Sequence, residues 1–234
     1  MNERNELAGA YDALYRKQGF GDAPAFYDWL VGLAMPSAGS RVLDIGCGAG
    51  GALRAIEAAG ARGVGVDLSS VALEHAQKVA PTAQLLRSDG SRLPFADDSF
   101  DVVLNLGNLE HFDDWRAGVR EMARVARPGG RAWVLLPNLF YSGTIWQTIR
   151  FGTGPDHHQP IDRFATRAEW HAVLESGGLR VLRSIPYHKG KWWKRLLPAN
   201  LAWHFLYETE PGDAAPAPAL PPLERRWIDR FDFR

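Results

Sequence analysis

The part of this sequence that most constrains its fold is the stretch from Arg41 to Gly51, where an apolar run leads directly into closely spaced glycines. The run suits a parallel strand that is covered on both faces. Gly46, Gly48 and Gly50 then remove the β-carbons from the turn that leads into the next helix. Because such a turn lets a ligand approach the backbone closely, the stretch predicts a nucleotide-cofactor site.

Two classes of cofactor use a turn of this kind, since Gly46, Gly48 and Gly51 also fit the dinucleotide pattern G-x-G-x-x-G. Asp44, two positions before the first glycine, distinguishes between them. A carboxylate there would repel a pyrophosphate at the helix N-terminus, but it would attract an ammonium group. The sequence therefore favours a positively charged ligand.

The turn resembles the first motif of the class I S-adenosylmethionine-dependent methyltransferases, and in particular their type 11-like, small-molecule group. That motif is an acidic residue followed by alternate glycines, here Asp44, Gly46, Gly48 and Gly50. Further motifs similar to those of the family follow in order, so that the resemblance covers roughly residues 40–138. They are Asp67 within Gly63–Ser69, Ser88-Asp89-Gly90, Leu93-Pro94-Phe95 with Phe100-Asp101, Leu109–Phe112, and Arg127–Arg131.

The resemblance implies S-adenosyl-L-methionine as the cofactor and a small molecule as the methyl acceptor. Strand ends in a parallel sheet converge on one crevice, and the polar residues near those ends should therefore meet there. The expected contacts are Asp44, Gly46, Cys47, Gly48 and Gly50 at the methionine end, Asn105 near its amino group, Asp67 and Leu68 at the ribose and adenine, and Ser88, Asp89 and Gly90 at the base.

Strand and helix patterns alternate from residue 41 to residue 137, which is typical of parallel α/β proteins. Together with the resemblance, this predicts an α/β fold with a Rossmann-like, seven-stranded, mostly parallel sheet and helices on both faces. The expected strands are 41–46, 62–67, 84–87, 101–105 and 131–137. The expected helices are 50–59, 70–79 and 114–126, the last capped by Asp113 or Asp114.

We expect one methyltransferase domain over residues 1–210, with the cofactor-binding core at 40–138. Apolar residues at helical spacing predict two helices within residues 1–36, which would form a lid. Tyr15 would then cover the methionine end of the cofactor, or it would simply pack its helix on the core. The substrate-side part, 139–210, should contain helices near 141–149 and 166–175, a polar loop at 152–160 and a strand at 179–187. Residues 211–234, rich in proline and alanine, predict an extended C-terminal arm.

His111, with Glu110 beside it, is the candidate general base for an oxygen or nitrogen acceptor, because histidine titrates near neutral pH. It could equally be an orienting group. His157 and His158 are weaker candidates, since adjacent loop histidines usually face solvent in different directions. Cys47, the single cysteine, is expected to be a small packing residue rather than a nucleophile, and we expect no metal site.

The formal net charge is zero and the sequence pI is about 7.1, which argues against a protein devoted to nucleic-acid binding. The lone cysteine, the mixed charges at the start and the lack of an apolar run of ~20 residues predict a cytoplasmic protein. Residues 176–207 combine basic and aromatic side chains. They could hold an anionic or lipid-linked acceptor, or give peripheral membrane contact through 187–207, or their aromatic residues could close the sheet edge. No feature of the sequence indicates an oligomeric state.

Two other functions fit parts of the pattern. One is a non-catalytic cofactor-binding module. The other is an NAD(P)-dependent oxidoreductase, which Asp44, Asp89 and the Pro128-Gly129-Gly130 turn disfavour. A variant of the enzyme hypothesis comes from Glu110-His111-Phe112, which resembles a stretch of the cyclopropane fatty acid synthases, whose methyl acceptor is an alkene.

Overall fold

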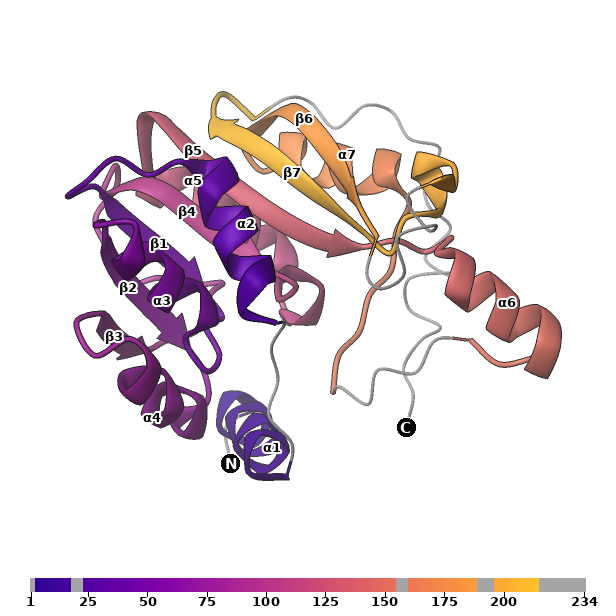
Figure 1. The fold of residues 1–234 in the computed structure, drawn as a ribbon, viewed down its shortest axis with the longest axis horizontal. Helices are drawn as coiled ribbons and strands as arrows, with labels where there is room; N and C mark the ends of the chain where they lie inside the picture. The colour runs from indigo at the N-terminus through magenta and orange to yellow at the C-terminus, as the bar shows by residue number, and fades with distance from the viewer. Residues whose placement is uncertain (1–2, 18–22, 155–159, 189–195, 215–234) are drawn as a thin grey trace.

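The computed structural model describes residues 3–17, 23–154, 160–188 and 196–214. Its centre is a seven-stranded sheet with the strand order β3-β2-β1-β4-β5-β7-β6 (Figure 1). Only β7 runs antiparallel to its neighbours, which confirms the predicted Rossmann-like, mostly parallel sheet. The strands are β1 (Arg41–Ile45), β2 (Arg62–Asp67), β3 (Gln84–Arg87), β4 (Phe100–Leu106), β5 (Ala126–Pro137), β6 (Leu179–Tyr187) and β7 (His204–Pro211).

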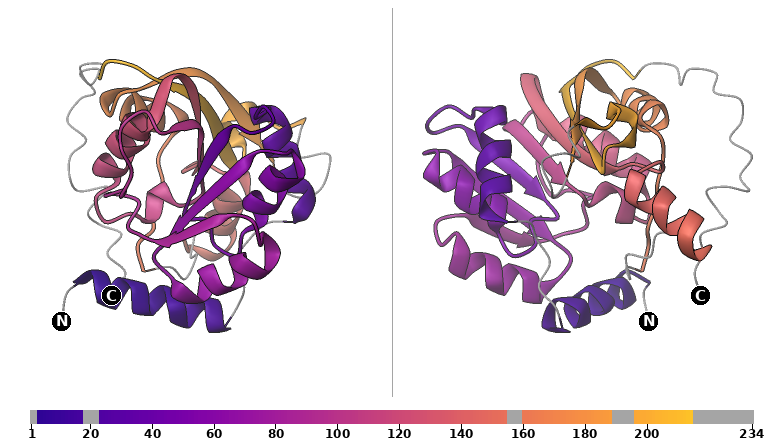
Figure 2. Two further views of the ribbon diagram at one scale, coloured as in Figure 1. Left: turned by 90° about the vertical axis from the view of Figure 1, so that its left-hand side faces the viewer. Right: turned by 45° about the vertical axis from the view of Figure 1, so that its right-hand side comes forward.

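Helices cover both faces of this sheet, with α2 and α3 on one face and α5 and α7 on the other (Figures 1 and 2). Each face has its own cluster of buried apolar side chains, so the core consists of two layers separated by the strands. The helices are α1 (Glu3–Lys17), α2 (Pro24–Ala34), α3 (Gly51–Ala58), α4 (Ser70–Val79), α5 (Trp115–Val125), α6 (Ser142–Phe151) and α7 (Arg167–Ser176), with short 3₁₀ helices η1 (Leu109–His111) and η3 (Ala199–Leu201).

Most predicted elements lie within one or two residues of the observed bounds, and those of β2, β3, β6 and α4 coincide with them. Asp114 caps α5, as one of the two expected caps, by accepting a hydrogen bond from the Ala117 N–H at 2.9 Å. Strand β5 starts at Ala126 rather than at residue 131. Its first residues pair with β4 across a register shift between Phe100 and Val102, so the glycine-containing turn interrupts a strand instead of preceding it.

Sequence analysis assigned no strand to His204–Pro211, which forms β7 between β5 and β6. Phe205 and Tyr207 pack in the cluster on one face of the sheet and Leu206 packs in the cluster on the other. A strand that is buried on both faces shows no alternation of polar and apolar residues, so its pattern is ambiguous. Of the alternatives left open for residues 176–207, Phe205 and Tyr207 therefore fit the one in which the aromatic residues close the sheet.

Helix α1 lies apart from the sheet and beside α4 (Figures 1 and 2). Its Asp12 carboxylate accepts hydrogen bonds from the Ser69 hydroxyl at 2.6 Å, the Ser70 hydroxyl at 3.2 Å and the Val71 N–H at 3.3 Å. A negative charge is favourable at this point, because the N-terminus of α4 carries a partial positive charge. Asp12 thus ties α1 to the end of the sheet where α4 begins.

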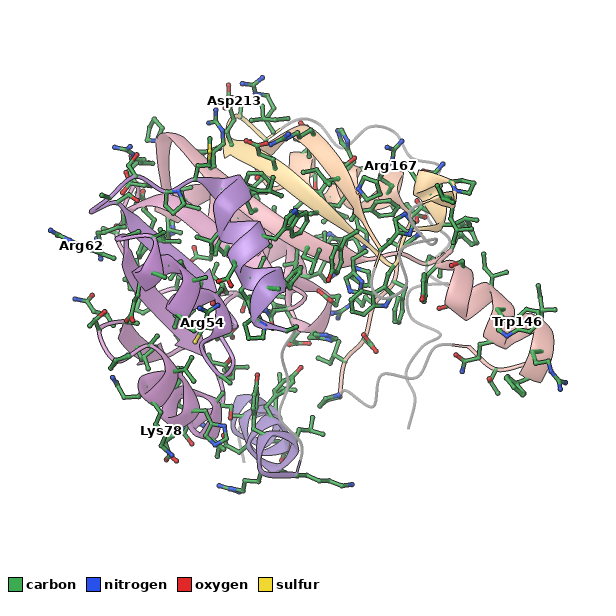
Figure 3. All side chains as sticks on the ribbon, viewed as in Figure 1. Arg54, Arg62, Lys78, Trp146, Arg167 and Asp213 are labelled. Carbon is green, nitrogen blue, oxygen red and sulfur yellow. The ribbon has the colours of Figure 1, made fainter. Side chains whose placement is uncertain are left out.

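Helix α6 projects from the other end of the molecule, and none of its side chains is buried. Figure 3 shows Trp146 on this helix, far from the sheet, and 64% of its surface is exposed. None of the helices in the described ranges has both the length and the apolar character that crossing a lipid bilayer requires.

We predict that Gly118→Ala destabilises the protein by about 1–3 kcal/mol, the usual cost of overpacking a core. A β-carbon on Gly118, in α5, would lie 2.6 Å from the Phe112 ring and 3.1 Å from Leu109. Urea unfolding followed by tryptophan fluorescence measures the effect. Gly32→Ala, in α2, is the matched control: nothing lies within 4 Å of its β-carbon, so the better helix propensity of alanine should stabilise by up to about 1 kcal/mol. Equal effects of the two substitutions would contradict the packing described for Gly118.

Candidate functional site

A crevice lies where the glycine turn after β1 meets helix α1. It consists of two adjoining cavities of about 520 and 620 Å³, and side chains or backbone from five residues form a wall common to both. The shared wall consists of Tyr11, Tyr15, Gly46, Asn108 and His111. We call the 520 Å³ part, which includes Asp44 and Glu110, the first cavity, and the 620 Å³ part, which includes Asp67 and Asp89, the second cavity.

The glycine turn has a backbone conformation that favours glycine. Gly46, Gly48 and Gly50 have φ angles of +69°, +52° and +85°, where a side chain is strained. A β-carbon on Gly46 would also lie 2.4 Å from the Asn108 side chain, and one on Gly48 would lie 2.7 Å from the Tyr15 hydroxyl. Gly46 and Gly48 line the first cavity, whereas Gly50 packs against α4 and lines neither cavity. The close approach at this turn is therefore made partly by the protein's own side chains.

Asp44 lines the first cavity and only 2% of its surface is exposed. Burial, together with the nearby charge of Asp67, raises the pKa of Asp44 to about 7. Cys47 lines the same cavity and is buried. Burial first, and then Asp44 and Asp67, raise the pKa of the Cys47 thiol, so that it stays protonated and acts as a packing group at neutral pH.

Asp67 lines the second cavity at the end of β2, next to Leu68. One of its carboxylate oxygens accepts a hydrogen bond from the Gly48 N–H at 2.9 Å, and the other accepts one from the Ser69 N–H at 2.8 Å. Burial raises the pKa of Asp67, although these hydrogen bonds oppose the rise. The carboxylate thus links the glycine turn to the start of α4 at the edge of the cavity.

Ser88, Asp89 and Gly90 form the turn after β3, and all three line the second cavity. Oδ1 of Asp89 accepts hydrogen bonds from the backbone N–H of Ser91 at 2.8 Å and from its hydroxyl at 2.7 Å. A β-carbon on Gly90 would lie 2.3 Å from the Phe112 ring. The turn is therefore fixed by Ser91 on one side and by Phe112 on the other.

Two asparagines lie near the end of β4, Asn105 within the strand and Asn108 just beyond it. Asn105 is fully buried, accepts the Leu109 N–H at 2.9 Å and lines neither cavity. Asn108 lines both cavities, and its Nδ2 donates to the Gly46 carbonyl at 3.1 Å and to the Leu106 carbonyl at 3.2 Å. Sequence analysis missed Asn108. The signal for it was its place just beyond the strand and directly before Leu109–Phe112.

His111 lies between two carboxyl groups. Its Nδ1 is 2.6 Å from the Ile161 carbonyl oxygen, which can only accept a hydrogen bond, so this geometry assigns the proton to Nδ1 and the lone pair to Nε2. Nε2 is 3.8 Å from Glu110 Oε1, and Nδ1 is 3.6 Å from Asp162 Oδ1. Asp162 also lines the first cavity and was not singled out from the sequence.

Glu110 lines the first cavity and its side chain is only 3% exposed. Burial, and secondly the charge of Asp162, raise the pKa of Glu110 to about 8. Within the described residues its Oε2 atom has no hydrogen-bond partner. Glu110 is therefore a buried, mostly protonated acid at neutral pH, with one oxygen available to a ligand.

Tyr11 and Tyr15 bring α1 to both cavities. Burial is the main cause that raises the pKa of each phenol, so both are neutral. The Tyr11 hydroxyl is buried and lacks a hydrogen-bond partner in the described part of the chain. A buried polar atom of this kind at a cavity favours a ligand with a polar group.

Several expected features lie elsewhere. His157, His158 and the basic and aromatic residues between 189 and 195 fall outside the described residues, as does most of the predicted C-terminal arm. Among the residues that are described, no group of three or more His, Cys, Asp and Glu side chains is arranged to hold a metal ion. Tyr187 packs on Phe26 and Trp29, and Trp203 lines the first cavity.

The sequence matches known methyltransferases over the part that contains the glycine turn and strands β1 to β4. Residues 43–134 match the family model described as a methyltransferase domain. A probable S-adenosylmethionine-dependent methyltransferase of Mycolicibacterium smegmatis is 34% identical over 153 residues, which is 64% of this chain and 55% of that protein. A demethylmenaquinone methyltransferase of Corynebacterium kroppenstedtii is 38% identical over 99 residues, 42% of either chain. The chain spans about half the length of the curated relatives it matches.

The fold also matches solved structures. The crystal structure of an S-adenosylmethionine-dependent methyltransferase from Mesorhizobium loti superposes with a TM-score of 0.61 at 18% sequence identity, covering 78% of this chain and 97% of that one. At this level of identity the match establishes the fold.

We predict that the free energy of unfolding falls as the pH rises from about 5 to about 8. The pKa values of about 7 for Asp44 and about 8 for Glu110 lie above the ordinary values of 3.8 and 4.5, so in this window the folded protein holds protons that the unfolded chain has released. Because the native state binds more protons, raising the pH favours unfolding. Urea unfolding at several pH values measures the slope.

Asp44→Asn and Glu110→Gln cannot release that proton, so each should flatten the pH dependence of the unfolding free energy by up to a few kcal/mol across the window. Asp97→Asn is the control, because the Asp97 side chain is 73% exposed, and it should keep the wild-type slope. An unchanged slope in both buried variants would contradict their protonation in the folded protein.

Proposed function

We propose that this protein transfers a methyl group from S-adenosylmethionine to an O, N or C atom of a small molecule by in-line displacement. The premise is that the chain belongs to the class I S-adenosylmethionine-dependent methyltransferases. The observation that carries the proposal is the continuous crevice, in which Asp67 and Asp89 line the second cavity, while Asp44 and the Glu110–His111 pair line the first. A cationic nucleoside and an acceptor can therefore occupy adjoining cavities with a shared wall.

The residues of the crevice fit this cofactor. Asp67 and Leu68 are assigned to the ribose and adenine, and Ser88, Asp89 and Gly90 to the base. Asp44, next to Gly46, Cys47 and Gly48, is assigned to the methionine ammonium group, since its buried carboxyl has no cationic partner among the described residues. In the first cavity Asn108 takes the place expected of Asn105, which remains a supporting residue through its bond to Leu109.

When bound, the cofactor supplies an activated methyl carbon with a neutral thioether as leaving group. What remains for the protein is to align the acceptor, exclude water and hold the acceptor's proton. Tyr11 and Tyr15 of α1 cover the crevice and exclude water. His111, whose Nδ1–H is held by the Ile161 carbonyl, presents Nε2 as the proton acceptor.

Neither alternative has a specific observation in its favour. A cofactor-binding module that lacks activity would bind S-adenosylhomocysteine but transfer no label from methyl-labelled cofactor to any component of a small-molecule extract. An oxidoreductase would bind NADH more tightly than S-adenosylmethionine. The proposal includes a cytoplasmic location. It includes no membrane contact through the described aromatic residues of 187–207, because Tyr187 packs on Phe26, Trp203 lines the first cavity, and Phe205 and Tyr207 are buried.

We predict that Asp67→Ala and Asp89→Ala each weaken S-adenosylhomocysteine binding by about ten-fold or more, which corresponds to about 1.4 kcal/mol of lost hydrogen bonding. Isothermal titration calorimetry measures the dissociation constants. Asp97→Ala removes a carboxylate that pairs with Arg124 away from the crevice, and it should bind as the wild type does. Wild-type affinity in both crevice variants would overturn the assigned roles, and an absence of binding heat in the folded wild type would overturn the proposed function.

We predict that His111→Gln lowers kcat by about 10²- to 10⁴-fold for an O–H or N–H acceptor, the usual contribution of a general base, while S-adenosylhomocysteine affinity stays within a few-fold of wild type. Turnover of the acceptor identified from labelled extracts is the readout. His171→Gln, on the exposed face of α7, is the matched control and should leave kcat unchanged. Full activity of the His111 variant would remove His111 as the base.

A further inference from the structure

The first cavity is lined by acidic side chains that have little exposure to solvent. Glu110, Asp162 and Asp44 all line it, with Glu110 and Asp44 almost fully buried. The single lysine or arginine among its described lining residues is Arg54, which is 2.6 Å from Asp28 and is therefore already paired. Among the residues described around this cavity, Glu110 and Asp44 therefore have no lysine or arginine partner.

Glu110 is the acid most open to a ligand. Its side chain is 3% exposed, and within the described residues its only ionisable partner in ion-pair range is His111, at 3.8 Å. The Oε2 atom has no hydrogen-bond partner there. A buried polar atom without a partner is costly, and a donor supplied by a ligand would remove that cost.

Aromatic and apolar side chains form much of the remaining wall. Tyr11, Tyr27, Phe164 and Trp203 line the first cavity together with Leu135. Aromatic rings attract cations through their negatively charged faces, most strongly where water is excluded. An organic cation with an apolar body therefore fits this lining. An anion would instead meet the carboxyl groups of Glu110 and Asp162, and the described lining has no lysine or arginine apart from the paired Arg54.

We infer that the methyl acceptor is an amine that binds as its ammonium ion, with the Glu110 carboxyl as its main hydrogen-bond acceptor and the aromatic side chains of the first cavity around it. This inference rests on the proposed function and names the substrate class of the same site. It replaces the anionic acceptor that the basic residues between 180 and 195 suggested.

The chemistry balances with groups already present. The bound ammonium ion gives one proton to His111 Nε2, which leaves a lone pair on the acceptor nitrogen. The nitrogen then forms a bond to the methyl carbon as the carbon–sulfur bond breaks, and that electron pair stays on sulfur as a neutral thioether. The products are a methylated ammonium ion and S-adenosylhomocysteine, and the proton on His111 passes to solvent.

Burial, together with Asp162, raises the pKa of Glu110 to about 8, and this supports the inference. The groups around Glu110 are the Tyr11 phenol from α1, His111 from η1, and Asp162 and Arg163 from the segment before α7. A bound ammonium ion stabilises the ionised carboxylate, so binding at neutral pH should release a proton from Glu110.

The test uses three probes of similar shape: 2-phenylethylammonium, the neutral 2-phenylethanol and the anionic 3-phenylpropionate. Each is titrated by calorimetry into the whole protein saturated with S-adenosylhomocysteine. We expect the ammonium probe to bind at least about ten-fold more tightly than either of the others, a difference typical of a desolvated cation beside an acid and aromatic rings. Equal or tighter binding of the alcohol or the carboxylate, or no saturable binding of the ammonium probe, would overturn the inference.

Glu110→Gln keeps the shape of the side chain and removes its charge, so the preference for the ammonium probe should fall to within about three-fold. Asp97→Asn should keep the full preference. S-adenosylhomocysteine affinity, measured first on each sample, confirms that the variant is folded. If Glu110→Gln does not fold, Asp162→Asn serves instead and should reduce the preference.

The two failures can be told apart. A folded wild type that does not bind S-adenosylhomocysteine contradicts the proposed function. One that binds it but shows no preference for the ammonium probe, or a Glu110→Gln variant that keeps the whole preference, contradicts only the amine inference.

Discussion

The crevice depends on the carboxylate of Asp67, which fixes the glycine turn before any ligand is present. One oxygen accepts the Gly48 N–H and the other accepts the Ser69 N–H. The Gly46 and Cys47 N–H groups both donate to the Val66 carbonyl, at 2.8 and 3.0 Å, so the turn crosses the end of β2. Because these bonds hold the glycines at positive φ, the backbone stays open towards the cavities. A preorganised turn of this kind costs little further ordering when a ligand binds.

The acids of the crevice differ from those that stabilise the fold elsewhere. Glu121 accepts two hydrogen bonds from Arg124 at 2.7 Å, and that arginine side chain is the main cause of the lowered pKa of Glu121. Asp44 and Glu110 have no such partner in the described chain, and burial raises the pKa of both. A protein retains buried acids of this kind where function compensates their cost. A positively charged cofactor and a positively charged acceptor would each provide that compensation.

Most of the fold could be predicted from the sequence, because the spacing of apolar residues agreed with the positions of the residues that end helices and strands. Strand β2 and helix α4 lie between glycine, serine and proline residues that mark their ends, and their bounds follow from apolar spacing alone. Strand β7 could not be found in this way, because its burial on both faces removes the alternation that marks a strand. Its pairing between β5 and β6 is a property of the assembled sheet.

The site shows the same division. Residues at strand ends, such as Asp67 and Asp89, line the crevice because a parallel sheet brings those ends together. Asn105 and Asn108 are close together in sequence, and the sequence alone does not show where β4 ends. The structure was needed to show that Asn108, and not Asn105, lines the cavities. Asp162 carries no local signal at all. It lies about fifty residues from His111, and only the segment before α7 brings the two side chains within 3.6 Å.

Helix α1 makes the two cavities dependent on each other. Tyr11 and Tyr15 belong to the walls of both cavities, and Asp12, between them in sequence, is bonded to the start of α4. A ligand in the second cavity would therefore contact the same two tyrosine rings that line the first cavity. If the first ligand to bind fixes the position of α1, the second ligand finds this wall already ordered. The second binding event then does not carry the entropic cost of ordering the wall. The helix that we propose to exclude water from the crevice would thus also link the binding of the two proposed ligands.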